Sequence, residues 1–312
     1  MILTPRDISI LALLAHLSVA TAAQIRKQCF PNDHDGRLTR RRLQMLVAGG
    51  LLQKTRMEVV NPLSGMNAPV YFSARKALEF LSIHFEDASY LSRSSQRPQW
   101  QHLCHWVGLS DLHLLIDAAV ARETVFTLDT WVNEYDEVRP DATCPEERYR
   151  LYTLLTHKPR LVNASDYMFT LTAGEHTKVF FGEAEHGTTH PEKAAAEKSP
   201  GYAELSRRRA HRRFCPKASE KFVVLVTAPD PKWRAHLVKA FSTKQEPDLY
   251  RFAALTELTP ETFFRGNVWH RCDGRVGPLI KAEGVREPVP PGVRSVSEPG
   301  QNGRKEVVDT ST

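Results

Sequence analysis

The segment KFVVLVTAPD, residues 221–230, constrains the fold of this 312-residue chain more than any other segment. Its apolar residues run on without polar alternation, and a strand of this kind is buried on both faces of a sheet. The residues around it read, in order, as helix, strand, a strand hairpin, helix, this strand, helix and strand. We therefore expect an α/β domain with a mixed sheet over residues 101–284.

The hairpin and its neighbours are expected as follows. The strand-like runs are VFTLDTWVNEYD, RLVNASDYMFTL, KVFFGEAE and LYRFAALTEL, and the helices are QHLCHWVGLSDLHLLIDAAVARE, the segment after HGTTH, and PKWRAHLVKAF. We expect RPDATCPEERY to be a loop, and Ser199-Pro200-Gly201 to break the helix that contains it. Residues 87–100 read as a polar linker and residues 285–312 as a disordered tail.

The first 86 residues predict a winged helix-turn-helix. Thr4-Pro5-Arg6-Asp7 and Thr21-Ala22-Ala23-Gln24 are helix-start signals, and a third helix runs from about Arg37 to Gly49-Gly50. The strand LLQKTRMEVV, the turn NPLSGMNAP and the strand VYF follow, and we expect Ser73 to cap a further helix. Three helices and a hairpin in this order are typical of a winged helix, so the chain as a whole is expected to be α+β.

Basic residues concentrate on the parts of such a domain that meet DNA. Between Gly36 and Arg56 there are six Lys or Arg and no acidic residue. In a winged helix these positions face the major groove and the flanking phosphates. The predicted DNA-binding residues are Arg37, Arg40, Arg41, Arg42, Gln44, Lys54 and Arg56. The alternative is a protein-binding winged helix with a solvated arginine face.

Composition sets broad limits on function. Hydrophobic residues make up 41% of the chain, charged residues 25%, and the net charge of +6 favours an anionic partner. The five cysteines are scattered without a Cys-x-x-Cys motif, so we expect a reducing cytoplasm rather than disulfides. Residues 8–23 resemble a signal-peptide core, but they lack a basic segment before them. We expect an ordinary helix there, no segment apolar enough for a membrane, and no membrane partner.

The strand FFGEAE ends in two carboxylates. Glu183 and Glu185 are two residues apart, so their side chains share one face of the strand. Like charges side by side indicate an edge that faces water, or a positive group such as a metal ion or a lysine.

This second half resembles the core of the PD-(D/E)xK nuclease superfamily, and the whole layout resembles the replication-relaxation family of plasmids and other mobile elements. RRRLQMLVAGGLLQK is similar to that family's recognition-helix pattern, and SDYMFTL to its Asp-bearing strand. FFGEAEHGT is similar to its Glu-x-acid-x-Gly-Thr strand end, KSPGY to its Lys-x-x-x-Tyr helix, and FVVLVT and Trp269 also fit. The resemblance covers residues 3–272 and implies a winged helix joined to a restriction-endonuclease-like domain.

The resemblance implies a metal site in the second domain. Asp166 is the first acid and Glu183 the second, whereas Glu185 stands where the superfamily has Lys and Ser165 stands where it has Pro. We assign Asp166, Glu183 and Glu185 to Mg²⁺ or Mn²⁺, whose preferred ligands are carboxylate oxygens. Lys198 is the expected substitute for the missing lysine and would stabilise charge; Tyr202, one turn on, would touch phosphate or pack. The alternative is a Lys198–Glu185 ion pair on a surface that has lost catalysis.

Three other clusters need an interpretation. The run RRRAHRR contributes Arg207, Arg208, Arg209, Arg212 and Arg213, which we expect to contact DNA phosphates unless they form a solvated turn. His186 and His190 invite a zinc site with Glu183 and Glu185, although HGTTH is loop-like. The spacing of His102, Cys104, His105 and His113 matches no zinc pattern, so we expect packing and capping roles for them.

Three functions follow from these features. The first is a double-stranded DNA-binding protein of a mobile element that acts in replication, relaxation or transfer. The second is an active Mg²⁺- or Mn²⁺-dependent endonuclease, and the third is a transcriptional regulator with an inactive nuclease-like scaffold. A homodimer and contacts with replication or transfer proteins are further expectations; without catalysis no cofactor is expected.

Overall fold

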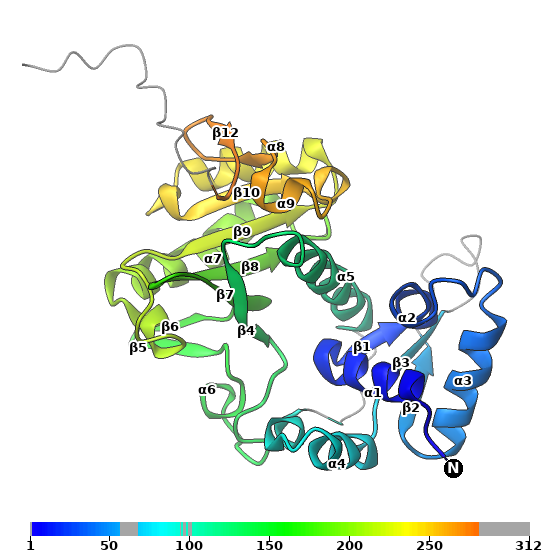
Figure 1. Cartoon of the computed structure of the whole chain (residues 1–312). Coiled ribbons are helices and arrows are strands. Elements are labelled where there is room, and N and C mark those ends of the chain that lie inside the picture. Colours follow the sequence, from blue (N-terminus) through cyan, green and yellow to red (C-terminus); the bar gives the residue numbers. More distant parts are fainter. Residues whose placement is uncertain (1, 57–67, 94, 96–97, 99–101, 281–312) are drawn as a thin grey trace, which may run out of the picture. The chain divides into compact units, whose positions relative to one another are not determined.

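A computed structural model describes residues 2–56, 68–93, 95, 98 and 102–280 of the chain (Figure 1). The described residues all belong to one compact unit, Met1–Ile280. The α+β class is confirmed for the described residues. Residues 61–67 of the expected turn at 61–69 and the expected tail at 285–312 lie outside them. The division of the chain near residues 86 and 100 stays a prediction.

The N-terminal region contains a three-stranded antiparallel sheet with the order β1-β3-β2. Its elements are α1 (Pro5–Leu17), β1 (Val19–Thr21), α2 (Ala22–Cys29), α3 (Arg37–Ala48), β2 (Leu52–Arg56), β3 (Pro69–Ser73) and α4 (Arg75–His84). Both predicted capping boxes are present, Thr4 with Asp7 and Thr21 with Gln24. The helices and strands enclose one apolar core that includes Ile10, Leu43 and Leu78.

Three details of this region differ from expectation. The short strand β1 had no recognisable signal in the sequence because three residues are too few for alternation to show. Ser73 is buried at the end of β3, and Ala74 is the residue before α4. The stretch after α4 includes a 3-10 helix, Ala88–Ser92, within the expected linker.

The second region is built on a seven-stranded mixed sheet with the order β12-β11-β10-β9-β8-β7-β4. Its main elements are α5 (Leu103–Val120), β4 (Thr127–Asn133), β7 (Tyr167–Ala173), β8 (His176–Ala184), α7 (Pro191–Arg207), β9 (Val223–Ala228), α8 (Pro231–Ser242) and β10 (Tyr250–Ala254). The chain ends its described part with α9 (Thr262–Arg265), β11 (Trp269–His270) and β12 (Val276–Gly277). Strands β4, β7 and β8 are antiparallel, whereas β8, β9 and β10 are parallel.

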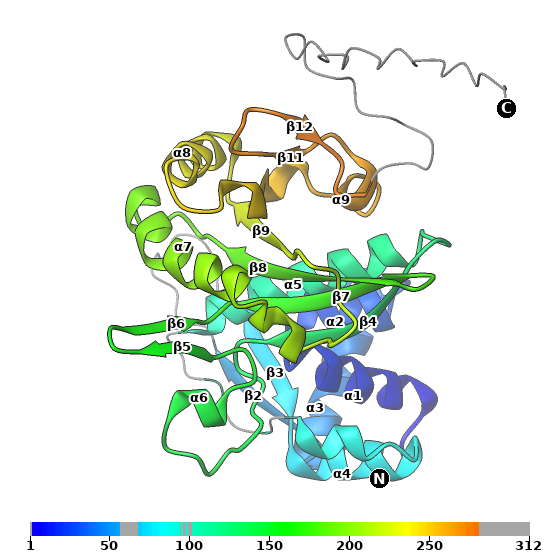
Figure 2. The same ribbon diagram turned by 90° about the vertical axis from the view of Figure 1, so that its left-hand side faces the viewer.

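The expectation that residues 221–230 contain a doubly buried strand is confirmed. Every residue of β9 is buried, and β9 stands in the middle of the sheet. Alternate side chains enter two cores: Val224 packs on the face covered by α7 and α8, and Leu225 on the face covered by α5 and α9 (Figure 2). Helices on both faces explain the unbroken apolar run.

The connection between β4 and β7 holds the main surprises. The expected loop at 139–149 contains the short helix α6 (Pro145–Arg148), and the expected strand at 160–171 is two strands. The first part of that expected strand is β6 (Arg160–Asn163). It pairs with β5 (Thr153–His157) in a hairpin that is separate from the main sheet. The second part is β7, in the main sheet.

Helix α7 does not break at Ser199-Pro200-Gly201, as was expected, but continues through Pro200. Proline costs a helix one backbone hydrogen bond without always ending it. Gly201 explains why the segment is retained: a Cβ there would lie 2.6 Å from the carbonyl oxygen of Val162. The glycine therefore lets α7 pack directly on β6.

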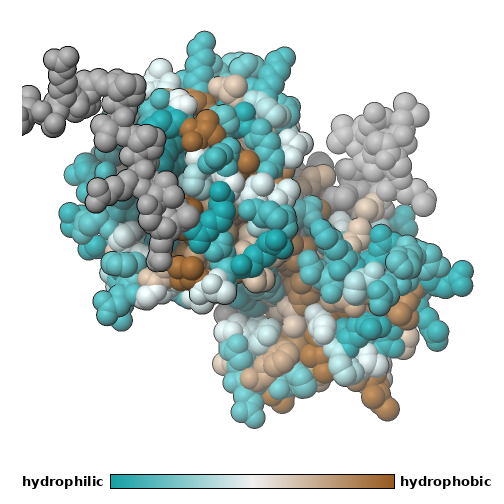
Figure 3. Space-filling model, turned by 45° about the horizontal axis from the view of Figure 1, so that its top comes forward, coloured by the Kyte–Doolittle hydropathy of each residue, from teal (hydrophilic) through white to brown (hydrophobic). Residues whose placement is uncertain are grey.

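Helix α5 is long and apolar enough to cross a membrane by length and composition, which corrects the expectation that no such segment exists. Core helices of folded proteins pass the same test. Leu109, Leu112 and Ile116 pack into the core under the main sheet, and Leu114 packs against the N-terminal core. The surface of the molecule also bears on this question: hydrophilic side chains cover much of the face shown in Figure 3, with hydrophobic ones scattered among them.

Candidate functional site

The antiparallel pairing of β7 and β8 brings Asp166 and Glu183 together. Tyr167 lies opposite Gly182, so the residue just before β7 meets the end of β8. The Asp166 amide donates to the Gly182 carbonyl oxygen at 3.1 Å, and the Ala184 amide donates to Asp166 Oδ2 at 2.7 Å. One carboxylate oxygen of Asp166 is thus fixed by backbone, and Oδ1 remains for other partners.

Helix α7 supplies two residues that hold Glu183. Lys198 pairs with Glu183 through Nζ, and the Tyr202 hydroxyl, one turn later, donates to the other carboxylate oxygen. The same hydroxyl lies 2.8 Å from Ser165 Oγ, and Lys198 Nζ lies 3.9 Å from Asp166 Oδ1. Glu183 is 1% exposed. The alternative ion pair of Lys198 with Glu185 is therefore corrected: the partner that Lys198 contacts is Glu183.

Burial and charge act against each other in this cluster. Burial raises the pKa of Glu183, and the Lys198 ammonium opposes that rise. Burial alone would lower the pKa of Lys198, but the carboxylates of Asp166 and Glu183 raise it, so the side chain stays protonated. Burial also raises the pKa of Glu185. The Glu185 amide donates to the Thr227 carbonyl oxygen at 2.9 Å, which fixes the backbone at the end of β8.

Sequence reasoning missed Glu134 at this site, and it wrongly gave His105 only a packing or capping role. Glu134 follows β4, and its amide donates to the Asp166 carbonyl oxygen at 2.8 Å. His105, on α5, has Nε2 at 3.4 Å from Glu134 Oε1 and 3.7 Å from Asp166 Oδ1. No local motif marked them, because they join the site only through the pairing of β4 with β7 and the packing of α5.

The protonation states of these two residues are also set by burial. Burial and the neighbouring Asp166 raise the pKa of Glu134 to about 7, although Trp106 Nε1 donates to it at 2.7 Å. Burial lowers the pKa of His105, and Asp166 opposes this shift. The neutral imidazole of His105 is the metal-binding form of histidine, whereas Glu134 must release its proton to bind a metal, so metal binding here should strengthen as pH rises.

The donor set fits a divalent metal; Asp166 is shared with the predicted ligands, while His105 and Glu134 take the places of Glu183 and Glu185. Among the described residues, the ligand atoms of His105, Glu134 and Asp166 lie within 4.8 Å of one another, and a second such group is His16, His113 and Asp117. Neither group includes Glu183 or Glu185. Both oxygens of Glu183 are already occupied by Lys198 and Tyr202. Carboxylates suit Mg²⁺ and Mn²⁺, and the imidazole favours transition metals, so Mn²⁺ is the better fit of the two predicted ions.

The zinc set suggested by HGTTH does not come together. His186 Nε2 lies 2.9 Å from Nδ1 of His105 on α5, so the His186 ring joins the carboxylate site through His105. His190 instead precedes α7, and its Nδ1 lies 2.8 Å from Glu192 on the surface.

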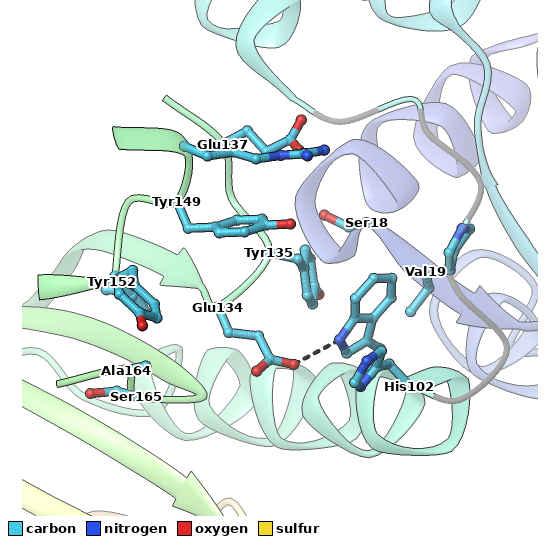
Figure 4. A pocket seen from close by; sticks show the side chains of 14 residues that line it. Ser18, Val19, His102, Glu134, Tyr135, Glu137, Tyr149, Tyr152, Ala164 and Ser165 are labelled. Atoms are coloured by element: carbon cyan, nitrogen blue, oxygen red, sulfur yellow. Dashed lines mark hydrogen bonds and ion pairs between the residues drawn. The ribbon is translucent and has the colours of Figure 1, made fainter. Parts of the chain in front are cut away.

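A cavity of about 400 Å³ adjoins the carboxylates (Figure 4). Glu134 and Ser165 form its boundary with the site, and aromatic rings supply much of the rest. The aromatic lining residues are His102, Trp106, Tyr135, Tyr149 and Tyr152. Trp106 and Tyr135 have ring centroids 4.4 Å apart, whereas Tyr149 and Tyr152 are only half-buried. Such a lining accepts a planar ring ligand.

The basic residues of α3 and β2 lie mostly on the surface. Arg37, Arg40, Arg41, Gln44, Lys54 and Arg56 are exposed. Arg42 differs from them: its guanidinium forms an ion pair with Asp7, which is fully buried in α1, and Arg42 Nε donates to Asp7 Oδ1 at 2.8 Å. Arg42 is therefore held inward, toward α1.

The second basic cluster is largely paired with acids. Arg207 and Arg208 both contact Glu204, while Arg209 and Arg212 both contact Glu220. Arg213 donates to the Arg150 carbonyl oxygen at 2.6 Å. Glu220 lies outside the run RRRAHRR, whose positive charge suggested phosphate binding. Its pairing with Arg209 and Arg212 is therefore visible only in the folded chain.

The comparison with protein families gives one match. The family model described as Replication-relaxation covers residues 11–218, two thirds of the chain, from α1 past the end of α7. The chain belongs to the replication-relaxation family. No curated protein and no solved structure matches. Membership in the replication-relaxation family supports a role in the replication or relaxation of plasmids or mobile elements, and the matched range includes α3, Asp166, Glu183 and Lys198.

Proposed function

We propose that this replication-relaxation protein binds double-stranded DNA of a plasmid or mobile element through a winged helix. The observation that carries the proposal is the exposed basic face of α3, Arg37, Arg40 and Arg41, continued by Lys54 and Arg56 on β2. No acidic residue interrupts this segment. Arg42 is paired with Asp7, and Arg37 Nε lies 3.7 Å from Asp35 in an exposed pair that water and salt weaken, so the exposed charge of the segment can meet phosphates. The order α1-β1-α2-α3-β2-β3, with the sheet order β1-β3-β2, supports the winged-helix assignment.

In this proposal α3 enters the major groove. Arg37, Arg40, Arg41 and Gln44 would then reach base edges or phosphates, while Lys54 and Arg56 contact the flanking backbone. Arg42 has a structural role instead, because its partner Asp7 is fully buried. The paired arginines near Glu204 and Glu220 make at most a secondary contact.

The test is a DNA-binding titration of the full chain over a range of salt concentrations. Arg40→Ala with Arg41→Ala should weaken binding and reduce the salt slope by about 0.9 for each lost phosphate contact. Lys232→Ala with Lys239→Ala removes the same charge from exposed positions on α8 and should change binding little. Equal loss in both double variants would show only a net-charge effect and contradict the proposal.

A second candidate function is a metal-dependent endonuclease, favoured by the convergence of Asp166, Glu183 and Lys198 with Glu134 and His105. A divalent ion held by Asp166, Glu134 and His105 would activate water and screen the phosphodiester. Lys198 and Tyr202 hold Glu183 in place, and the Lys198 ammonium stands where it can stabilise developing negative charge. The adjoining aromatic cavity supports this candidate, because an unpaired base of the same strand could stack there.

The test is nicking of supercoiled plasmid with Mg²⁺ or Mn²⁺. Asp166→Asn and Glu134→Gln should abolish nicking, with Mn²⁺ more effective than Mg²⁺ in the wild type. Glu192→Gln, an exposed carboxylate change on the same helix as Lys198, serves as the control and should retain it. DNA binding without nicking in either metal would rule out this candidate and leave a DNA-binding protein or a transcriptional regulator.

A further inference from the structure

A second group of metal-ligand side chains lies where α1 contacts α5, and it shares no residue with the carboxylate site. His16 is in the last turn of α1, and His113 and Asp117 are one turn apart on α5. Their ligand atoms lie within 4.8 Å of one another. Asp117 is 101 residues from His16 in the sequence, so no spacing motif could have revealed the group.

His113 is the strongest sign that this group binds a ligand. The residue is 1% exposed, and its Nε2 has no hydrogen-bond partner. Its ring stacks on Trp131 with centroids 3.6 Å apart and planes 6° apart, which fixes the direction of Nε2. An unpaired buried polar atom costs free energy, which ligation by a metal would recover. Burial lowers the pKa of His113 well below its usual value, so the ring is neutral, as a metal ligand must be.

The distances suit a small divalent cation. His16 Nε2 lies 2.9 Å from Asp117 Oδ2, and His113 Nε2 lies 3.8 Å from Asp117 Oδ1. Ligand atoms that share a tetrahedral zinc ion with bonds of about 2.0–2.1 Å stand about 3.3 Å apart. The two imidazoles approach different oxygens of Asp117, and the three ligand atoms lie within 4.8 Å of one another, so binding one ion requires the half-exposed side chains of His16 and Asp117 to turn toward His113 Nε2.

The surroundings leave one side of the group open. The side chains of His16 and Asp117 are 41% and 36% exposed, so a fourth ligand can come from solvent. Arg93 is the nearby charge that opposes a cation, but its guanidinium lies 3.7 Å from Asp136, which partly neutralises it. Two imidazoles and one carboxylate are a common ligand set for zinc.

We propose that His16, His113 and Asp117 form a zinc site that ties α1 to α5. One equivalent of Zn²⁺ bridges the N-terminal region and the helix that carries His105. Zinc would therefore stabilise the contact between the proposed DNA-binding region and the main sheet. The site is independent of the proposed functions, because none of its three ligands belongs to the DNA-binding face or to the carboxylate cluster.

The test uses metal-free full-length protein titrated with Co²⁺ as a spectroscopic substitute and with Zn²⁺ in competition with a chelating dye. The Asp166→Ala, His105→Ala double variant serves as the background, because it leaves Glu134 as the only member of the other metal-ligand group. In that background we expect one equivalent of Zn²⁺, visible absorption bands of tetrahedral Co²⁺, and a higher unfolding temperature with Zn²⁺.

The variants separate ligation from folding. His16→Ala and Asp117→Asn change half-exposed residues. Both variants should fold but should no longer bind the one equivalent of Zn²⁺. His113→Phe keeps a ring on Trp131 and should lose this binding as well. The matched control is His190→Ala, because His190 forms a surface pair with Glu192 but joins no three-ligand group among the described residues. Absence of Co²⁺ bands in the background protein, or bands unchanged by His16→Ala and Asp117→Asn, would overturn the proposal.

Discussion

At the scale of single residues, Gly182 is required by the ring of its cross-strand neighbour. A Cβ at position 182 would lie 1.9 Å from Cζ of Tyr167, whose ring is fully buried against Trp131. Gly182→Ala must therefore displace Tyr167, and we expect a loss of about 1–3 kcal/mol or more in the free energy of unfolding. Urea unfolding measures it. Gly277→Ala, which meets nothing within 4 Å, is the control and should change stability by less than about 0.5 kcal/mol.

Glu134 makes stability depend on pH. Burial raises its pKa from 4.5 to about 7, so between these values the folded chain holds a proton that the unfolded chain has lost. More protons bound in the folded state mean that stability falls as pH rises through this range. Glu134→Gln removes that contribution, so its stability should fall less steeply than that of the wild type. Urea unfolding over a pH series tests this, and parallel curves would contradict it.

At the scale of elements, the Asp7–Arg42 ion pair joins α1 to α3. Burial alone would raise the pKa of Asp7, but hydrogen bonds from Arg42 and Thr4 lower it. Arg42→Ala would leave a fully buried carboxylate without its partner, at a cost of about 3–5 kcal/mol. Arg41→Ala, an exposed change one position away, should leave stability within about 0.5 kcal/mol but weaken DNA binding. Thermal and urea unfolding of the two variants, together with DNA titrations, test this. A stable Arg42→Ala variant or an unstable Arg41→Ala variant would contradict these roles.

The elements also show how far a sequence can be interpreted. The strand β9 and both capping boxes were predictable, because an unbroken apolar run and a local hydrogen-bond pattern are written in neighbouring residues. The α7 break was wrongly expected, because Pro200 and Gly201 are local helix-breaking signals, whereas Gly201 here serves the close approach of α7 to the carbonyl oxygen of Val162, which is distant in the sequence. The hairpin of β5 and β6 was missed, because β6 and β7 read as one continuous strand in the sequence and β5 is only five residues long.

Some residues of the candidate site could likewise be predicted from the sequence, and others could not. Asp166, Glu183 and Lys198 could be singled out because a resemblance and the end of an apolar strand marked them. Glu134 and His105 could not, because strand pairing and helix packing bring them in from distant segments. The inward pairing of Arg42 was equally invisible, since its partner Asp7 is 35 residues away.

At the scale of the whole molecule, α5 links the N-terminal region to the main sheet through polar contacts as well as apolar packing. Ser110 Oγ donates to the Val19 carbonyl oxygen at 2.7 Å, and Gln24 Nε2 donates to Asp111 Oδ1 at 2.8 Å. The Tyr135 hydroxyl donates to the Leu17 carbonyl oxygen at 3.2 Å. Because these bonds and the packing of Leu114 must break together, we expect residues 2–280 to unfold in one cooperative transition.

The tryptophans make this prediction measurable, because all five lie between residues 100 and 269 and none lies in the N-terminal region. Tryptophan fluorescence therefore follows the main sheet, while hydrogen exchange of the α1 and α3 amides follows the N-terminal region. For the wild type we expect the fluorescence and the hydrogen exchange to give equal urea midpoints. Exchange of the α1 and α3 amides at lower urea concentration than the fluorescence change would mean two independent units. Gln24→Ala with Ser110→Ala should separate the midpoints, because it removes the polar contacts of α5 while leaving both apolar cores intact.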